Sequence, residues 1–137
     1  MKKVFIDTNV ILDFLLGREG CGYAKQILQF GDDGLIRNQT SFLSMANIAY
    51  VLRKYQSHNE TVGTLRLLMK EFSVLPMGDQ QFYEALASCG PDIEDTLQWT
   101  CAAFGESDCI VTSDIRHFLE SPIPVYTPKE FVTLLTE

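Results

Sequence analysis

The chain has 137 residues, of which 46% are hydrophobic and 21% are charged, and its formal net charge is −7. This length suits one domain and is too short for two independent ones, so we predict a single domain over residues 1–137. The composition excludes a disordered chain. The negative charge argues against coating of nucleic acid by a basic face, but acids that hold divalent cations are compatible with chemistry on phosphates.

No segment has the pattern of a membrane or secretion signal. The longest apolar stretches, such as VILDFLL, are interrupted by Asp13 and are far shorter than the roughly 20 residues of a membrane helix. Asp7 and Asp13 also interrupt the apolar segment that a signal peptide would need after the opening MKK. We therefore predict a cytoplasmic protein with no membrane partner.

The cysteines lack the spacing of a metal or redox site. They show no CxxC pair and no nearby His that would complete a zinc pattern, so we expect buried, reduced thiols. These residues are Cys21, Cys89, Cys101 and Cys109.

The hydrophobic pattern predicts alternating strands and helices along the chain. Strands are expected at 3–6, 35–41, 73–77, 109–114 and 124–126. Helices are expected at 9–16, 20–30, 42–55, 60–72, 80–88, 92–105 and 128–137. Ser41 or Thr40 is expected to cap the helix at 42–55, and Asp79 the helix at 80–88. This alternation predicts an α/β domain with a mainly parallel sheet.

Acidic residues stand at the ends of two predicted strands. Asp7 follows the first strand, and Asp114 ends the segment CIVTSD. The carboxyl ends of parallel strands share one edge of a sheet, and sites form at that edge. Each residue alone is equally well explained as a cap of the following helix, so both interpretations stay open at this point.

A third acidic group lies in PDIEDTLQW, where Asp92, Glu94 and Asp95 begin a helix and favour its dipole. Capping explains Asp92 as the N-cap and Asp95 as its capping-box partner. Asp95 nevertheless shares a helical face with Gln98, so it need not point to solvent. Three acidic segments at one sheet edge would repel unless a divalent cation were present, and Mg²⁺ or Mn²⁺ suits such a cluster. Phosphodiester hydrolysis is the natural chemistry of this arrangement.

The segments FIDTNVILDFL, PDIEDTLQ and SDCIVTSDIRHF, in this order and spacing, resemble the PIN domain family, including its VapC-like toxin nucleases. The resemblance covers nearly the whole chain. It implies a three-layer α/β/α fold and RNA cleavage with Mg²⁺ or Mn²⁺ by a metal-activated water. It also implies that Asp7, Asp95 and Asp114 are the metal ligands, with Asp92 assisting them.

Several polar residues flank these predicted ligands. Short side chains that could orient the carboxylates, or simply cap helices, are Thr8, Asn9, Thr112 and Ser113. Arg18 and Arg116 are candidate phosphate contacts, although an isolated Arg is more often a solvated surface charge. His117 either reaches the cleft or is a partly buried structural residue. Arg53 and Lys54 are assigned to the dipole at the end of their helix.

The sequence departs from the family pattern at one position. PIN domains usually carry a Glu on the helix after the second strand, and Asn47 aligns with it here. An amide oxygen can bind Mg²⁺ but adds no charge, so we expect weaker metal affinity or a dependence on substrate phosphate. The alternative is that Asn47 faces a wet cleft while Glu94 supplies the missing charge from across it.

The acidic residues predict metal-dependent phosphodiester hydrolysis, and the resemblance implies that the protein is a metal-dependent ribonuclease. The resemblance adds the role of toxin in a toxin–antitoxin pair, with an RNA substrate, an antitoxin protein as partner and a homodimer as a further expectation. The main alternative is a PIN fold that has lost turnover with Asn47 and binds RNA or a partner, although the acidic charge counts against RNA binding without metal.

Two other small α/β classes fit less well. A haloacid dehalogenase-type phosphatase needs a second acid two residues after the first, where Asn9 stands. A response-regulator receiver domain needs an acidic pair near the first strand and a lysine after the last one. Here the first strand opens with Lys2 and Lys3, and Lys129 follows a proline on the terminal helix.

Overall fold

The computed structural model describes residues 1–88 and 90–137, so the prediction for Cys89 lies outside the described residues. Cys101 and Cys109 are buried and free, and Cys21 is half-buried and free. Burial raises the pKa of Cys101 to about 12 and that of Cys109 to about 11. These two thiols are therefore protonated and unreactive at neutral pH. Within the described residues, no helix has both the length and the apolar composition of a membrane span.

Five parallel strands form one sheet in the order β3-β2-β1-β4-β5. They are β1 (Lys2–Ile6), β2 (Ile36–Ser41), β3 (Ser73–Leu75), β4 (Cys109–Val111) and β5 (Val125–Tyr126). The chain builds outward from β1 to β3, and then crosses to the other side of β1 for β4 and β5. The strand order thus reverses between β1 and β4, and open α/β sheets bind ligands outside the carboxyl ends of strands at such a point.

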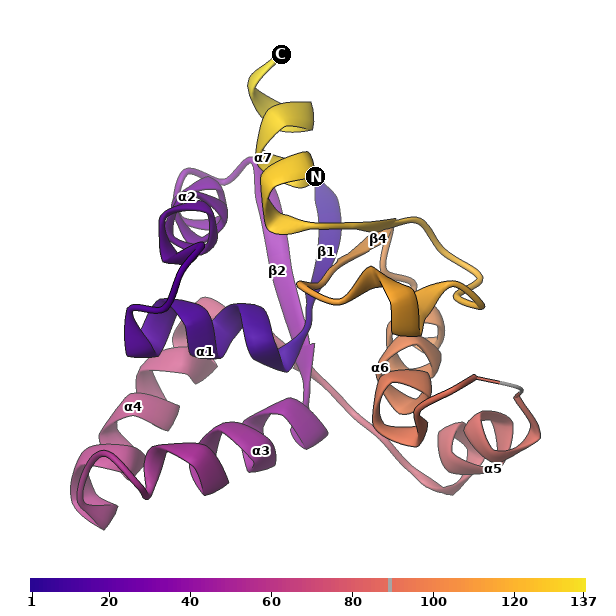
Figure 1. Cartoon of the computed structure of the whole chain (residues 1–137), viewed down its shortest axis with the longest axis horizontal. Helices are drawn as coiled ribbons and strands as arrows, with labels where there is room; N and C mark the ends of the chain where they lie inside the picture. The colour runs from indigo at the N-terminus through magenta and orange to yellow at the C-terminus, as the bar shows by residue number, and fades with distance from the viewer. Residues whose placement is uncertain (89) are drawn as a thin grey trace.

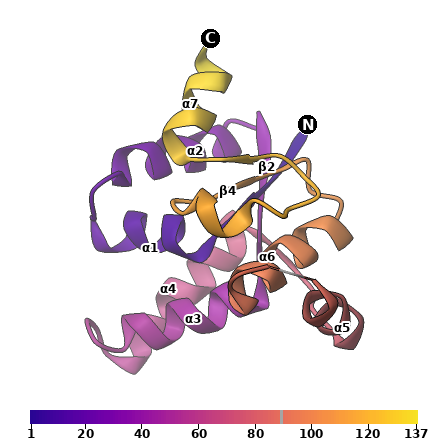
Figure 2. The ribbon, with the colours of Figure 1, turned by 45° about the vertical axis from the view of Figure 1, so that its right-hand side comes forward.

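Helices cover both faces of this sheet. They are α1 (Thr8–Leu16), α2 (Cys21–Asp32), α3 (Phe42–Leu52), α4 (His58–Glu71), α5 (Asp79–Ala87), α6 (Ile93–Phe104) and α7 (Pro128–Thr136), with a short 3₁₀ helix, η1 (Ile115–Phe118). The two views show α1 to α4 on one side of the strands and α5 and α6 on the other (Figure 1, Figure 2). The predicted three-layer α/β/α architecture is confirmed.

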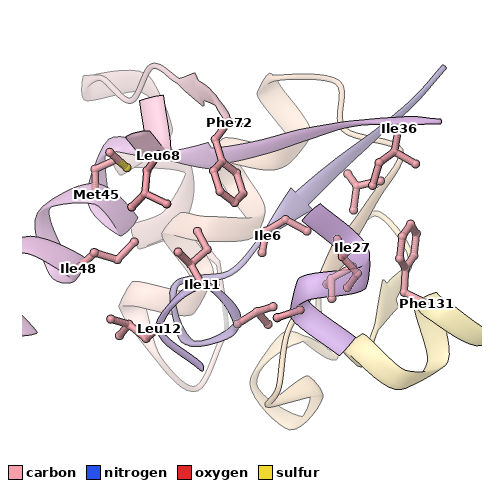
Figure 3. Packing of buried hydrophobic residues seen from close by; sticks show 14 of the residues in the cluster. Ile6, Ile11, Leu12, Ile27, Ile36, Met45, Ile48, Leu68, Phe72 and Phe131 are labelled. Atoms are coloured by element: carbon pink, nitrogen blue, oxygen red, sulfur yellow. The ribbon is translucent and has the colours of Figure 1, made fainter. Parts of the chain in front are cut away.

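The alternation of side chains along β1 divides the core in two. Val4 and Ile6 belong to a large cluster with side chains from α1 to α4 and α7, part of which is seen in Figure 3. Phe5 points to the opposite face and joins a smaller cluster with α6. In that cluster Trp99 meets Phe118 edge to face, with ring centroids 5.9 Å apart. A strand that is buried on both faces has a continuous run of apolar residues in its sequence, and VFI is such a run.

The predicted caps are partly confirmed. Ser41, and not Thr40, caps α3, because its hydroxyl accepts from the Ser44 backbone N–H at 3.0 Å. The Thr40 hydroxyl instead donates to the Ile6 carbonyl at 3.0 Å. The prediction of Asp79 as a cap is wrong. Gly78 is the N-cap of α5, and its backbone N–H is satisfied by the Gln81 side chain at 2.7 Å.

Three predicted elements end two or more residues earlier than expected. The strand predicted at 73–77 ends at Leu75. The strand predicted at 109–114 ends at Val111, and beyond it the Asp114 backbone N–H donates to the Thr112 hydroxyl at 3.2 Å in a local turn. The helix predicted at 42–55 ends at Leu52, and Arg53 is its C-cap. The end of α1 is as predicted: Gly17 adopts φ +64°, a left-handed conformation in which a side chain is strained.

Candidate metal centre

Asp7 joins β1 to α1 without a loop. Its backbone N–H donates to the Val111 carbonyl at 2.9 Å, which keeps it tied to the neighbouring strand β4. Its Oδ1 accepts from the Thr8 backbone N–H at 2.9 Å and so caps α1. One residue therefore ends the strand and begins the helix, which fixes its carboxylate at the sheet edge.

The Asp7 carboxylate is desolvated, with the residue only 4% exposed. Beside the capping bond, Oδ1 accepts from Gln98 Nε2 at 3.3 Å and Oδ2 accepts from the Thr112 hydroxyl at 2.9 Å. Burial raises the pKa of Asp7 and the charge of Asp114 raises it further, against the lowering effect of these hydrogen bonds. Hydrogen bonds to neutral groups thus compensate only part of the burial, and the carboxylate would gain from a cation.

Gln98 of α6 connects this carboxylate to the start of α3. Its Nε2 lies 3.1 Å from the Thr8 hydroxyl and 2.6 Å from that of Ser44, and its Oε1 accepts from Ser41 at 2.5 Å. Sequence reasoning missed Gln98 and Ser44 as site residues. The available signal was that Gln98 shares a helical face with Asp95.

Gln98→Leu should destabilise the protein. The substitution leaves the buried oxygens of Asp7, Ser41 and Ser44 short of partners, and we expect a loss of about 1–3 kcal/mol in the free energy of unfolding. Urea denaturation measures this loss. The matched control is Gln80→Leu at an exposed position of α5, which should change stability by less than about 0.5 kcal/mol. Equal effects of the two substitutions would contradict the bridging role.

The acids at the start of α6 have divided roles. Asp92 is the N-cap, and its Oδ1 accepts from the Asp95 backbone N–H at 3.1 Å. The Asp95 carboxylate contacts His117, with its Oδ2 2.8 Å from Nδ1 of that residue. Burial is the main cause that raises the pKa of Asp95 to about 6, and the charge of Asp7 is the second. Asp7 and Asp95 therefore lie within each other's electrostatic field.

Asp114 approaches the same edge from the segment after β4. Its Oδ1 accepts from Nε of Arg116 at 3.0 Å, and its Oδ2 lies 3.3 Å from Nδ1 of His117. The Arg116 hydrogen bond is the main cause that lowers the pKa of Asp114. The side chain of Arg116 is itself 83% exposed. His117 thus stands between Asp95 and Asp114.

The tightest group of potential ligands differs from the predicted one. Among the described residues, a trio whose ligand atoms all lie within 4.8 Å of one another consists of Asp92, Asp95 and His117. The predicted trio shares only Asp95 with it. Carboxylates repel one another without a cation, and His117 is inserted between two of them. Two further acids are linked to this group: the charge of Asp7 raises the pKa of Asp95, and the Asp114 carboxylate contacts His117.

A cleft of about 230 Å³ opens beside these acids, where the start of α1, α3 and α6 surround the carboxyl end of β1 (Figure 1). Asp7 and Asp95 line it, and so do Asn47 and Glu94. Its other lining residues are Thr8, Asn9, Leu12, Leu43, Tyr50, Val51 and Gln98. The position without charge, Asn47, therefore faces the same space as two predicted ligands.

Two residues predicted for the site make their contacts away from the acids at the sheet edge. The Ser113 hydroxyl donates to Asp13 Oδ2 at 3.3 Å, and Nη1 of Arg18 lies 3.8 Å from Asp13 Oδ1. Both are thus engaged by Asp13, and not by the acids at the sheet edge. Among the predicted orienting residues, Thr112 contacts Asp7 through its hydroxyl, whereas Thr8 does so through its backbone N–H.

A parallel α/β/α sheet with acids at the reversal of its strand order places the chain among α/β proteins with an acidic edge site. A PIN domain family model matches residues 3–116, and the chain belongs to the PIN domain family. The predicted resemblance is thereby confirmed. No curated protein matches the chain in sequence.

Solved structures share this fold. A toxin–antitoxin complex from Klebsiella pneumoniae has a TM-score of 0.67 at 20% identity, covering 91% of this chain and 97% of that chain. DNA-bound VapBC from Salmonella typhimurium has a TM-score of 0.69 at 18% identity, covering 93% and 99%. FitAcB from Neisseria gonorrhoeae has a TM-score of 0.65 at 15% identity, covering 92% and 98%. At these identities the likeness shows the fold.

Proposed function

We propose that the chain is a metal-dependent ribonuclease that hydrolyses RNA phosphodiester bonds with a metal-activated water. The observation that carries this proposal is the convergence of Asp7, Asp95 and Asp114 at the reversal point of the sheet. Burial is the main cause that raises the pKa of Asp7 and Asp95; the charge of Asp114 adds to the effect on Asp7, and the charge of Asp7 to that on Asp95. Desolvated carboxylates of this kind are costly as bare charges and favourable around a divalent cation.

The donor set fits Mg²⁺ or Mn²⁺. A carboxylate has about four acceptor sites, and Asp7 receives three hydrogen bonds, so it retains capacity for an ion. Asp95 and Asp114 offer further oxygens, and His117 offers a nitrogen, a ligand type that Mn²⁺ accepts more readily than Mg²⁺. When bound, the ion supplies Lewis acidity to the phosphate and lowers the pKa of water.

The side chains near Asp7 orient the carboxylates and do not themselves attack the phosphate. The hydroxyls nearest Asp7 are committed to hydrogen bonds: Thr112 donates to Asp7, Thr8 pairs with Ser44 at 2.8 Å, and Ser41 donates to Gln98. None of them contacts a His that would act as its base. Water is therefore the nucleophile, and these groups hold the carboxylates in place for it.

The chemistry of the RNA products tests this proposal. A mixed RNA pool should be cleaved with Mg²⁺ or Mn²⁺ and left intact in EDTA. Cleavage in H₂¹⁸O should place one ¹⁸O in the product phosphate, and no 2′,3′-cyclic phosphate should form, because the attacking oxygen comes from water. Cleavage in EDTA, or cyclic phosphate ends, would sink the proposal, because the 2′-hydroxyl would then be the nucleophile.

Metal affinity should depend on pH through Asp95. Its pKa of about 6 means that a proton must leave before the carboxylate can bind a cation. We expect Mn²⁺ affinity to fall about tenfold per pH unit below 6 and to change little above 7. Calorimetric titration at pH 5.0 to 7.5 measures this dependence, and Asp95→Asn should remove most of it. An affinity that is constant from pH 5 to 7 would contradict the assignment.

The biological role that we propose is that of a toxin neutralised by an antitoxin protein. The structural neighbours described as VapBC and toxin–antitoxin complexes support this role. Expression of the chain alone should arrest growth, and co-expression of a small neighbouring reading frame should restore it. Arrest by an Asp7→Asn variant would separate toxicity from cleavage. It would favour the alternative of a binding module with a weakened metal site, to which Asn47 points.

A further inference from the structure

One wall of the cleft carries an exposed aromatic ring. Tyr50 lies on α3, three residues after Asn47, and both side chains line the cleft beside Asp7 and Asp95. The Tyr50 side chain is not sequestered, since the residue is 57% exposed. Arg53 lies over this ring, so the part of the ring that stays exposed is the surface it can offer to a bound molecule.

Two cations accompany this ring. The guanidinium carbon of Arg53 lies 4.0 Å from the Tyr50 ring centroid, and Nζ of Lys54 lies 5.6 Å from it. The dipole at the end of α3 explains positive charge at these positions, but it does not require both to gather on one ring. The chain has 11 Lys and Arg residues and 18 Asp and Glu residues, so a pair of positive side chains beside the acidic cleft is opposite in sign to the net charge of the chain.

We propose that Tyr50, Arg53 and Lys54 form a subsite that binds single-stranded RNA, with one base stacked on the ring and the flanking phosphates paired with the two cations. Stacking on an aromatic side chain needs a base whose face is free, as in unpaired RNA. In an A-form duplex the bases are stacked on one another and offer no such face. The inference rests on the ribonuclease proposed above and assigns the entry of the RNA strand to the C-terminal end of α3.

The charge arrangement supports this occupant. Phosphates approaching Asp7, Asp95 and Glu94 meet repulsion that a metal ion offsets only locally. Arg53 and Lys54 supply attraction at the C-terminal end of α3, on one side of the acids. Tyr50 lines the cleft and contacts these cations, so a base on its ring would lie between them and the acids.

Binding without cleavage tests the subsite. Short RNA carrying one 2-aminopurine is titrated in Ca²⁺, with its integrity checked on a gel, and both anisotropy and 2-aminopurine emission are recorded. Tyr50→Ala should weaken binding at least about fivefold and abolish the quenching that stacking produces. Tyr50→Phe should retain both, because it keeps the ring. The matched control is Tyr55→Ala, which removes a nearby tyrosine that is 64% exposed and does not line the cleft.

The contribution of Arg53 and Lys54 is measured separately, by the salt dependence of RNA binding. The double substitution Arg53→Gln and Lys54→Gln should lower the slope of log affinity against log salt by about 1.4, at about 0.7 per lost phosphate contact on a single strand. Arg66→Gln, at an exposed position of α4, should leave the slope unchanged. Thermal melting of each variant verifies folding, and if Tyr50→Ala does not fold, the change in salt slope decides the matter.

The outcomes separate this inference from the function on which it rests. Tyr50-dependent binding in a protein that never cleaves RNA would support the subsite and overturn the ribonuclease. Metal-dependent cleavage with RNA binding unchanged by Tyr50→Ala would support the ribonuclease and overturn the subsite. A loss of affinity that is equal for Tyr50→Ala and Tyr55→Ala, or duplex RNA bound as tightly as single strands, would also overturn the subsite.

Discussion

Asp7→Asn should abolish metal-dependent RNA cleavage while making the metal-free protein more stable. The loss of activity follows because the substitution removes the most buried charge of the proposed metal centre. Loss of groups that only orient metal ligands costs about 10–100-fold, so loss of a ligand should exceed about 100-fold in rate at fixed Mn²⁺. Initial rates on a labelled RNA measure this loss.

The gain in stability follows from the sign of the pKa shift. Burial raises the pKa of Asp7 in the folded protein, so ionisation of this residue opposes folding as the pH rises above its unfolded value. Asn is isosteric and is an equally good N-cap. Its oxygen can still accept from Thr8 and Gln98, and its amide can donate to the Thr112 hydroxyl. We expect a higher melting temperature in EDTA at pH 7.5, by roughly 2–4 °C for each kcal/mol gained.

A matched control separates burial from charge. Asp79→Asn removes an exposed acid at the start of α5 and should change neither the melting temperature nor the cleavage rate. A lower melting temperature for Asp7→Asn than for the wild type, or an unchanged cleavage rate, would contradict the description of Asp7 as a metal ligand whose burial costs stability. Such a result would mean that the charge of Asp7 is not both required for cleavage and unfavourable for folding.

Asn47→Glu is the second substitution with a large expected effect. Asn47 lines the cleft with Asp7 and Asp95, so a carboxylate there would add a charged ligand to the same site. We expect Mn²⁺ affinity to rise on the order of tenfold and cleavage to require less metal. The same charge should lower the melting temperature in EDTA, because it lies near Glu94 and Asp95.

Asn47→Gln controls for this gain, because it matches Glu in size but carries no charge. Calorimetric titration with Mn²⁺ compares the two variants directly. If Glu and Gln at this position bind Mn²⁺ equally well, Asn47 does not face the ion. If Asn47→Glu converts an inactive protein into a nuclease, the natural protein is the binding module given above as the alternative.

The sequence was informative where a local pattern has one structural solution. The run VFI followed by Asp7 predicts a buried strand that ends in a cap, and Gly17 predicts the end of the next helix; both hold. The alternation of strands and helices predicted a parallel sheet. The strand order was not predictable, because nothing local to β4 specifies pairing with β1, and that pairing is what brings Asp114 toward Asp7.

The remainder of the site depends on contacts between distant segments. Gln98 is an ordinary helical residue in sequence, and its role appears only when α6 meets the hydroxyls of Thr8, Ser41 and Ser44. The position of His117 depends on the 3₁₀ turn of η1, which places its ring between two acids. For Arg53 the sequence suggested only a dipole effect, because its contact with Tyr50 is a matter of side-chain direction.

The most direct test of the central claim is an anomalous difference map from crystals of the protein saturated with Mn²⁺ at pH 7.5. We predict a peak at the carboxyl end of β1, bonded to the carboxylates of Asp7, Asp95 and Asp114. The same map from Asp7→Asn crystals should lose that peak. A peak held by Asp92, Asp95 and His117 without Asp7, or no peak at this edge in saturated crystals, would contradict the proposed metal centre.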